Sequence, residues 1–293
     1  MRYTRRKKQY KNQKGGNINE TACICAIMIK EEPYVDEWIQ YYIYGLGFTH
    51  IFIYDNSEEN SLKDLPNKYP GKVTIRHFPG KVKQLPAYND FLEKNRTDPN
   101  KYTWCAFFDC DEFLVLKEQT NVIDFLKKYC NEGGVGINWY LYGDSHLTEK
   151  TNEPVTKRFI MRDKNVNKNI KTIIKCDDVD TIERIHSIDG FKAGKNNKDT
   201  NGKIIEWLFN KDGPVDIAVI NHYFTKTREE FNTKQTRARA DTGEVRPDSN
   251  YNKHNFNDVP DNSAYKIYER AQAEYAKIKK GGGKKARKLN NNN

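Results

Sequence analysis

The chain has 293 residues, of which 37% are hydrophobic and 12% aromatic, enough to build a substantial core. No apolar run approaches the ~20 residues that a membrane-spanning helix needs, and the first twenty residues lack the apolar segment of a secretory signal. The six cysteines form no CxxC pair, which is typical of free thiols in a reducing compartment rather than of a zinc site. These features exclude an integral membrane protein and predict a soluble, cytoplasmic one.

The formal net charge of +10 is concentrated at the two ends of the chain. Residues 1–14 and residues 277–288 each contain seven Lys or Arg and no acid, so the rest of the chain carries a formal charge of −4. We therefore expect disordered basic tails at 1–19 and at 279–293, the second rich in Gly and Asn, around a folded body. Such tails serve solubility or contact polyanions; specific nucleic-acid binding or a nuclear address is the alternative.

Strand and helix patterns alternate through the first half of the chain. Apolar runs predict strands at 22–29, 50–54, 73–78, 103–108 and 135–142, and helical patterns predict helices at 35–43, 61–65, 87–94 and 121–129. This alternation predicts an α/β fold with a mostly parallel central sheet and helices on both faces. Ligands of such sheets bind beyond the carboxyl ends of the strands.

The second half of the chain is less regular. We expect strands at 171–175 and 216–221, a helix at 228–239, an exposed loop at 192–203 and irregular structure at 241–263. The segment 264–280 is amphipathic at best. We therefore expect the main domain to end near residue 240 and a C-terminal extension, irregular or helical, to cover residues 241–278.

Two aspartates, Asp109 and Asp111, directly follow the predicted strand 103–108. Two ionised carboxylates that point to one place at the edge of the sheet would repel one another, and a divalent cation between them would remove this repulsion. Oxygen ligands with open coordination positions favour Mg²⁺ or Mn²⁺, which can bridge a diphosphate and neutralise the charge that grows as it leaves. Asp pairs are also common in exposed loops, so it is the position after a buried strand that favours a metal site.

Two further polar groups stand at predicted strand ends. Asp55 could accept hydrogen bonds from a ribose or a base, or it could cap a turn, because Asp-Asn-Ser sequences favour turns. His222 follows the predicted strand 216–221 and could either complete the metal shell or be a packed core histidine.

Six segments of the chain together form a pattern that no single motif provides. They are Ile29 to Trp38 with Tyr41 to Gly47, Ile51 to Ser57, Gln84 to Asn89, Ala106 to Phe113, Ile137 to Gly143 and Ile220 to Lys226. In sequence and in order they resemble glycosyltransferase family 92, a relative of family 2, over roughly residues 22–240. Two positions depart from the pattern: Glu31 stands where the family usually has Asn, and Tyr42 where it usually has His.

The resemblance implies a GT-A fold over residues 20–240 and transfer of a hexose from a nucleotide-sugar donor, with galactose from UDP-galactose as the first candidate. Asp109 and Asp111 match the metal-binding DxD motif of the family, and Asp109 also belongs to the donor site. His222 matches the histidine of the family's NHY segment, which often ligates the metal in this fold. The other donor-side matches are Lys30, Asp55 and Gln84.

The resemblance also leads us to expect direct displacement with inversion, on a glycan or glycoconjugate acceptor. A carboxylate would remove the proton of the acceptor hydroxyl, a contribution of ~10²–10⁴-fold to the rate. Asp144, just past the last strand of the first half, is the first candidate for this base, and Glu183 is the reserve. Trp139 and Tyr142 could stack on a sugar or belong to the core, and His186 could be structural or contact the donor.

Two alternative functions use other features of the sequence. A nucleotidyltransferase acting on sugar phosphates would use the same two aspartates, but it needs a Gly-rich phosphate loop after the first strand, where this chain reads Lys30-Glu-Glu-Pro33. A polyanion-binding protein would act through the basic tails, and its affinity would fall steeply with salt.

Overall fold

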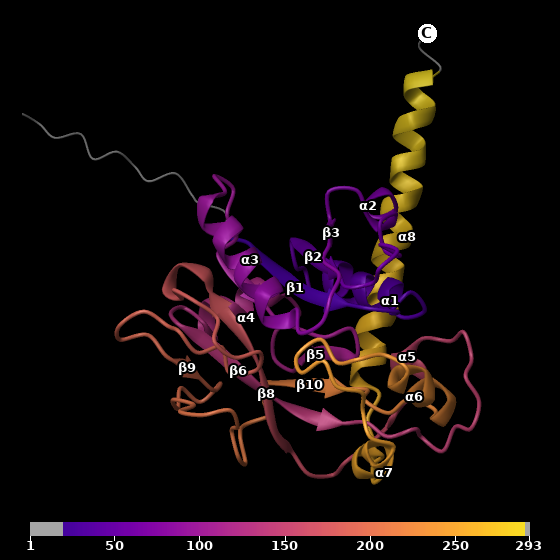
Figure 1. Cartoon of the computed structure of the whole chain (residues 1–293). Coiled ribbons are helices and arrows are strands. Elements are labelled where there is room, and N and C mark those ends of the chain that lie inside the picture. The colour runs from indigo at the N-terminus through magenta and orange to yellow at the C-terminus, as the bar shows by residue number, and fades with distance from the viewer. Residues whose placement is uncertain (1–19, 291–293) are drawn as a thin grey trace, which may run out of the picture.

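A sheet of nine strands runs through the protein and carries helices on both faces (Figure 1). The computed structural model describes residues 20–290, with side chains to residue 280. The strands are β1 (Ala22–Met28), β2 (His50–Asp55), β3 (Val73–His77), β4 (Trp104–Ala106), β5 (Glu112–Leu116), β6 (Gly134–Leu141), β8 (Asn167–Lys175), β9 (Asn197–Lys198) and β10 (Ala218–His222). Their order is β3-β2-β1-β4-β8-β6-β10-β5, with β9 paired to β6. All of these strands except β8 and β5 run in one direction, so the predicted α/β class with a mostly parallel sheet is confirmed.

Different helices bury the two faces of the sheet. The helical elements are α1 (Val35–Gln40) with the π-helical turn η1 (Tyr41–Gly45), α2 (Leu65–Lys68), α3 (Gln84–Thr97), α4 (Val122–Tyr129), α5 (Val155–Arg158), the 3-10 turn η2 (Cys176–Asp178), α6 (Arg228–Gln235), α7 (Ser249–His254) and α8 (Ser263–Asn290). On β1, Ala22 and Ile24 belong to the core formed with α1, η1, α4 and α8, whereas Cys23 and Cys25 belong to the core formed with α3. Because successive side chains of a strand point to opposite faces, burial on both sides explains the uninterrupted apolar run of β1.

The structure corrects several local predictions. Strand β5 has no predicted counterpart, because its residues follow directly on the acidic turn after β4. The segment 192–203 is not simply an exposed loop, since it contains β9 and the buried residues Asn197 and Asp199. The segment 241–263 is not wholly irregular either: it contains α7 and β11 (Val259–Pro260), which pairs with β7 (Met161–Arg162).

The first turns of the C-terminal helix α8 are part of the core. Ala264, Ile267 and Ala271 are buried in the same core as η1. A Cβ atom on Gly45 would lie only 2.9 Å from Ile267 Cγ2. The close approach of the two helices therefore depends on the absence of a side chain at position 45.

Helix α8 continues to Asn290 (Figure 1). Most of the segment 279–293, which the sequence predicts to be disordered, is therefore helical in the structure. The other predicted basic tail, at 1–19, lies outside the described residues. Within residues 20–290, no helix has both the length and the apolar character that crossing a membrane requires.

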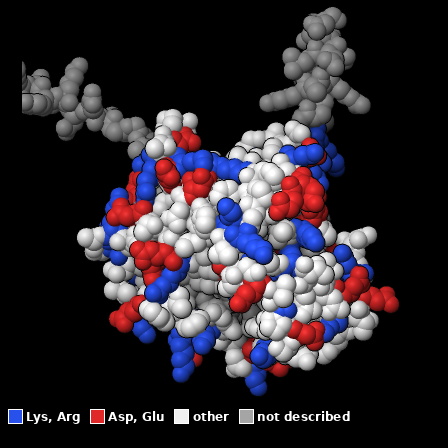
Figure 2. Space-filling view, in the orientation of Figure 1, with Lys and Arg blue, Asp and Glu red and all other residues white. Residues whose placement is uncertain are grey.

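One of the buried ion pairs joins two helices, in contrast to the mixed charges of the surface. On the face shown in Figure 2, Lys and Arg are interspersed with Asp and Glu, and exposed pairs of this kind contribute only about 0–1 kcal/mol each. Arg158 of α5 and Glu230 of α6 are 3% and 1% exposed and form two parallel hydrogen bonds of 2.8 and 3.0 Å. Glu230 also completes the capping box of α6 with Thr227. The pair therefore fixes the start of α6 against α5.

We predict that replacing Glu230 changes both stability and its pH dependence. Burial alone would raise the pKa of Glu230, but the hydrogen bonds and charge of Arg158 outweigh it and lower the pKa from 4.5 to about 2. The stabilisation is therefore fully present above pH 4.5 and is lost as the pH falls toward 2. Glu230→Gln should lower the free energy of unfolding at pH 7 by about 3–5 kcal/mol, because it leaves a buried arginine unpaired.

Urea unfolding at a series of pH values measures both effects. In the Glu230→Gln variant the loss of stability on acidification should be smaller than in the wild type. Glu118→Gln, which removes an exposed partner of Lys128, is the control and should leave unfolding unchanged. Equal stability of Glu230→Gln and wild type at pH 7 would contradict this account of the pair.

Candidate active site

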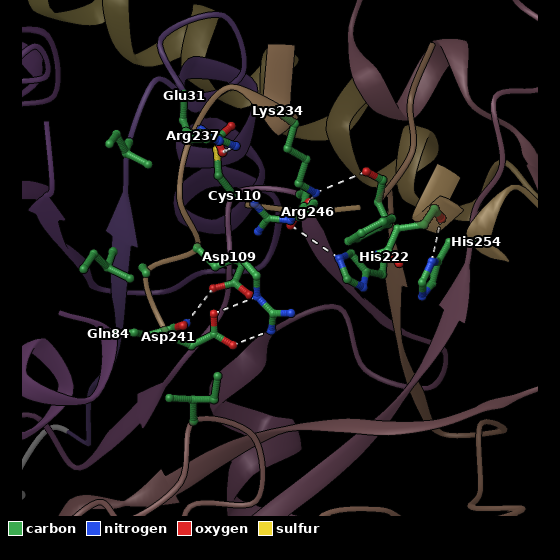
Figure 3. Close-up of a pocket in the computed structure, with 18 of the residues that line it drawn as sticks. Glu31, Gln84, Asp109, Cys110, His222, Lys234, Arg237, Asp241, Arg246 and His254 are labelled. Atoms are coloured by element: carbon green, nitrogen blue, oxygen red, sulfur yellow. Dashed lines mark hydrogen bonds and ion pairs between the residues drawn. The ribbon is translucent and has the colours of Figure 1, made fainter. Parts of the chain in front are cut away.

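A cavity of about 310 Å³ lies at the carboxyl edge of the sheet (Figure 3). Much of its lining comes from residues at or just after the ends of β1, β4, β6 and β10, and from the segment 234–246. These four strands run in the same direction, so their carboxyl ends meet at one edge. This is where ligands bind in α/β sheets of this type. Asp109, Asp111, Gln84 and His222, four of the residues predicted for the site, line the cavity together.

A buried lysine holds Asp109 in place. Lys171 of β8 is fully buried, and its Nζ lies 2.8 Å from Asp109 Oδ2 and 3.4 Å from Glu112 Oε2. Gln84 Nε2 donates to Asp109 Oδ1 at 3.2 Å, and the Asp109 N–H donates to Glu112 Oε2 at 2.9 Å. Burial alone would lower the pKa of Lys171, but the two carboxylates outweigh it and raise that pKa. Asp109 is thus oriented by β8 and α3 and already has a cationic partner.

Asp111 and His222 face one another because β5 pairs with β10. The antiparallel register sets Glu112 opposite His222, and Asp111 immediately precedes Glu112. Asp111 Oδ1 lies 3.5 Å from His222 Nε2, and its Oδ2 lies 2.5 Å from Lys234 Nζ. Burial alone would raise the pKa of Asp111, but Lys234 and His222 outweigh it and hold that pKa well below its usual value. Burial lowers the pKa of His222, so the imidazole is neutral near pH 7.

These contacts allow the metal prediction to be tested against the residues present. A carboxylate oxygen and a neutral imidazole face each other at Asp111 and His222, and none of the residues that the structure describes forms a hydrogen bond with His222 Nδ1. Among the described residues, no group of three or more His, Cys, Asp or Glu side chains could hold a metal ion. Divalent cations of this class bind few protein groups when phosphate oxygens complete the shell. Asp111 and His222 are therefore compatible with a cation whose shell is completed by other ligands, and metal binding stays a prediction.

A cationic segment, residues 234–246, supplies part of the cavity lining and has no counterpart among the predicted site residues. Its cavity-lining cations are Lys234, Arg237, Arg239 and Arg246. Arg237 forms an ion pair with Glu31, and Arg239 forms one with Asp241. The only signal in the sequence is the spacing of basic residues within a polar stretch, which is also typical of a solvated surface.

Two predicted donor residues do not line the cavity. Asp55 is fully buried: its Oδ1 accepts from the N–H and O–H of Ser57 at 2.9 and 2.6 Å, and its Oδ2 accepts from the Leu62 N–H at 2.9 Å. Asp55 thus organises the turn after β2, as the turn-cap alternative expects, and its donor role stays a prediction. Lys30 is exposed and borders a small depression that shares Lys234 and Arg237 with the cavity, so its donor role stays a prediction.

The two candidate bases also lie outside the cavity lining. Asp144 accepts hydrogen bonds from Tyr251 O–H at 2.7 Å, Asn255 Nδ2 at 2.8 Å and Asn257 Nδ2 at 3.0 Å. Burial alone would raise the pKa of Asp144, but these hydrogen bonds outweigh it and lower that pKa, which weakens the carboxylate as a base. Asp144 therefore anchors the segment 251–257, and its role as the base stays a prediction that these contacts do not favour. Glu183 is exposed.

The aromatic residues of this region divide between the cavity and the core. Trp139 lines the cavity, and its ring contacts those of His186 and His222 edge-on, with centroids 5.4 and 4.4 Å apart. His186 lines the cavity too, and burial lowers its pKa to about 4, so it is neutral. Tyr142 is fully buried and belongs to the core.

Comparison with known sequences adds an independent observation. Residues 19–259 match the sequence profile of glycosyltransferase family 92, which is most of the chain. The chain belongs to glycosyltransferase family 92. Family 92 proteins of Arabidopsis thaliana and Ricinus communis are 23% and 25% identical to it over 76% and 72% of its length. The chain spans 38% and 37% of the length of these two curated relatives.

Solved structures with a similar arrangement match about half of the family 92 chain. TarS from S. aureus is 11% identical, with a TM-score of 0.33 over 53% of this chain and 47% of TarS. HddC from Yersinia pseudotuberculosis is 8% identical, with a TM-score of 0.34 over 53% of this chain and 77% of HddC.

The two departures from the family 92 pattern both have structural roles. Glu31, in place of Asn, is the ion-pair partner of Arg237 at the cavity. Tyr42, in place of His, is fully buried; its O–H donates to the Glu112 carbonyl at 2.9 Å and accepts from the Leu114 N–H at 3.0 Å. Tyr42 therefore supports β5, the strand that follows the acidic turn.

We predict that Asp144 contributes to stability rather than to proton transfer. Asp144→Ala should lower the free energy of unfolding by about 1–3 kcal/mol, because several partly buried donors lose their acceptor. Urea unfolding measures this, with Glu149→Ala, an exposed position on the same loop, as the control that leaves it unchanged. A general base behaves differently: Asp144→Asn would keep wild-type stability and reduce kcat by ~10²–10⁴-fold. That result would reverse the present assignment.

Proposed function

We propose that this family 92 protein transfers a hexose from a UDP-sugar to a glycan or glycoconjugate acceptor, with inversion at the anomeric carbon. Galactose is the first candidate for the hexose. The observation that best supports this proposal is the cavity at the carboxyl edge of the sheet, which Asp109, Asp111 and His222 line together with four cationic side chains. The carboxylates can bind a metal ion, and the Lys and Arg side chains can bind phosphate. Together they form a site suited to a nucleoside diphosphate.

The donor is expected to lie with its diphosphate between the acidic turn and the segment 234–246. The cavity volume of about 310 Å³ is at the lower end of the range for small-molecule sites, ~300–1,000 Å³. Asp109, held by Lys171 and Gln84, is suited to accept hydrogen bonds from donor hydroxyls, because its orientation is fixed before the ligand binds.

Asp111 and His222 would hold Mn²⁺ or Mg²⁺ together with the donor phosphates. When bound, the cation would supply Lewis-acid stabilisation of the departing diphosphate, an effect of several kcal/mol. The pairing of one carboxylate with an imidazole favours Mn²⁺ over Mg²⁺, because Mg²⁺ prefers oxygen ligands. Lys234, whose Nζ also donates to the Phe224 carbonyl at 3.1 Å, adds a fixed positive charge beside the same carboxylate.

The remaining lining of the cavity is suited to a sugar. Trp139 offers an aromatic surface, and the neutral rings of His186 and His222 can donate or accept hydrogen bonds. Inverting displacement also needs a base for the acceptor hydroxyl. Since neither Asp144 nor Glu183 lines the cavity, we assign no residue to that step.

Release of UDP from UDP-galactose, measured with and without Mn²⁺ in the presence of simple saccharide acceptors, tests the proposal. We expect Mn²⁺-dependent release, and we expect Asp111→Asn to reduce kcat/KM by about 10²-fold or more, because a metal-ligating carboxylate is lost. Asp124→Asn, at an exposed position on α4, is the matched control and should behave like the wild type.

Two results would contradict parts of the proposal. Equal turnover of Asp111→Asn and wild type at every Mn²⁺ concentration would contradict the assignment of Asp111 as a metal ligand. A thermal-shift panel of nucleotide sugars identifies the donor independently, since a ligand of the native state raises Tm. Stabilisation by sugars of another nucleotide but by no UDP-sugar would remove the UDP assignment.

A further inference from the structure

The charged side chains that line the cavity are paired, with one exception. Each acid has a cation of its own: Asp109 has Lys171, Asp111 has Lys234, Glu31 has Arg237 and Asp241 has Arg239. Arg246 lines the same cavity (Figure 3), and its guanidinium has no hydrogen bond or ion pair with any of the described residues. The cavity therefore holds one positive charge for which the described part of the chain supplies no counter-ion.

The surroundings of Arg246 make this unpaired charge costly. The residue is half-buried, and burial lowers the pKa of its guanidinium. Asp111 opposes this effect, whereas the nearby Arg237 and Arg239 add to it. A partly buried cation without a partner is unfavourable until an anion binds beside it. Because the acids of the cavity are already paired, they oppose an incoming anion less than free carboxylates would.

The backbone around Arg246 is held in position without help from its side chain. Gln235 Nε2 donates to the Arg246 carbonyl at 3.2 Å. Earlier in the same segment, the Arg239 N–H donates to the Glu244 carbonyl at 2.8 Å, and the Gln84 N–H donates to the Ala240 carbonyl at 3.0 Å. The segment is thus tied both to itself and to α3. A free guanidinium on a fixed backbone has less conformational freedom to lose on binding.

We propose that Arg246 anchors a phosphate subsite that binds a diphosphate directly, with no metal ion between them. A guanidinium offers parallel N–H donors that match two phosphate oxygens. Lys234 and Arg239 also line the cavity, but each is paired with an acid, so Arg246 supplies the positive charge that is left over. The identification of this diphosphate as part of the donor rests on the proposed function, whereas the existence of the subsite does not.

Inorganic pyrophosphate in the presence of EDTA is the appropriate probe, because it contains no nucleoside and no sugar and the chelator removes metal. Isothermal titration calorimetry on the full chain should show that Arg246→Gln binds pyrophosphate at least about tenfold more weakly than the wild type. Arg246→Lys keeps the charge but loses the planar fork, so its affinity should be intermediate. Arg228→Gln is the matched control, since Arg228 pairs with Asp248 and does not line the cavity.

The outcomes separate the subsite from the proposed function. Equal affinity of Arg246→Gln and wild type for pyrophosphate overturns the inference, and so does an absence of wild-type binding in EDTA. Equal loss in Arg228→Gln also overturns it, because binding would then be a general effect of surface charge. An unchanged Tm of ligand-free Arg246→Gln shows that the fold is retained, and should this variant not fold, Arg246→Lys decides by the same comparison. If the arginine dependence is found but no UDP-sugar is turned over, the subsite stands and the donor assignment fails.

Discussion

The antiparallel pairing of β5 with β10 is the constraint on which the site depends. It sets Glu112 opposite His222 and so brings Asp111, the residue before β5, beside the imidazole. Tyr42, in the helical turn η1, holds the same strand by hydrogen bonds between its hydroxyl and the backbone of Glu112 and Leu114. A shift of the register by one residue would turn every side chain of the strand to the opposite face. The acid and the imidazole therefore face each other only in this register.

Charge compensation within the chain explains how so many ionic groups are buried at one place. An isolated buried carboxylate costs several kcal/mol, so each one needs a partner with good geometry. Lys171 reaches Asp109 from β8, and Lys234 reaches Asp111 from the end of α6. Helix α6 is in turn fixed by the pair between Glu230 and Arg158. Segments distant in sequence thus assemble one site through a chain of ion pairs.

The site residues that could be predicted from the sequence are those that directly follow a recognisable strand. Buried parallel strands have continuous apolar sequences, and their ends meet at one edge, which placed Asp109 and Asp111 in the site. The strand pattern left His222 open between site and core, and the family resemblance favoured the site. Lys171 could not be recognised, because only the strand order shows that this lysine is buried beneath the acidic turn. Asp144 illustrates the converse: it stands at a strand end, but the donors that occupy its oxygens come from a segment far along the chain. Such long-range partners leave no local signal.

The close contact between Gly45 and α8 has a consequence for biosynthesis. Helix α8 completes the core on one face of the sheet, yet it follows all of the strands in the sequence and is translated after them. A ribosome releases the chain from its N-terminal end, so most of the strands emerge while the helix that covers them is still being made. During synthesis the nascent protein therefore exposes an apolar face of its sheet. More apolar surface needs protection by chaperones at this stage than in a protein whose covering helices are translated before the strands.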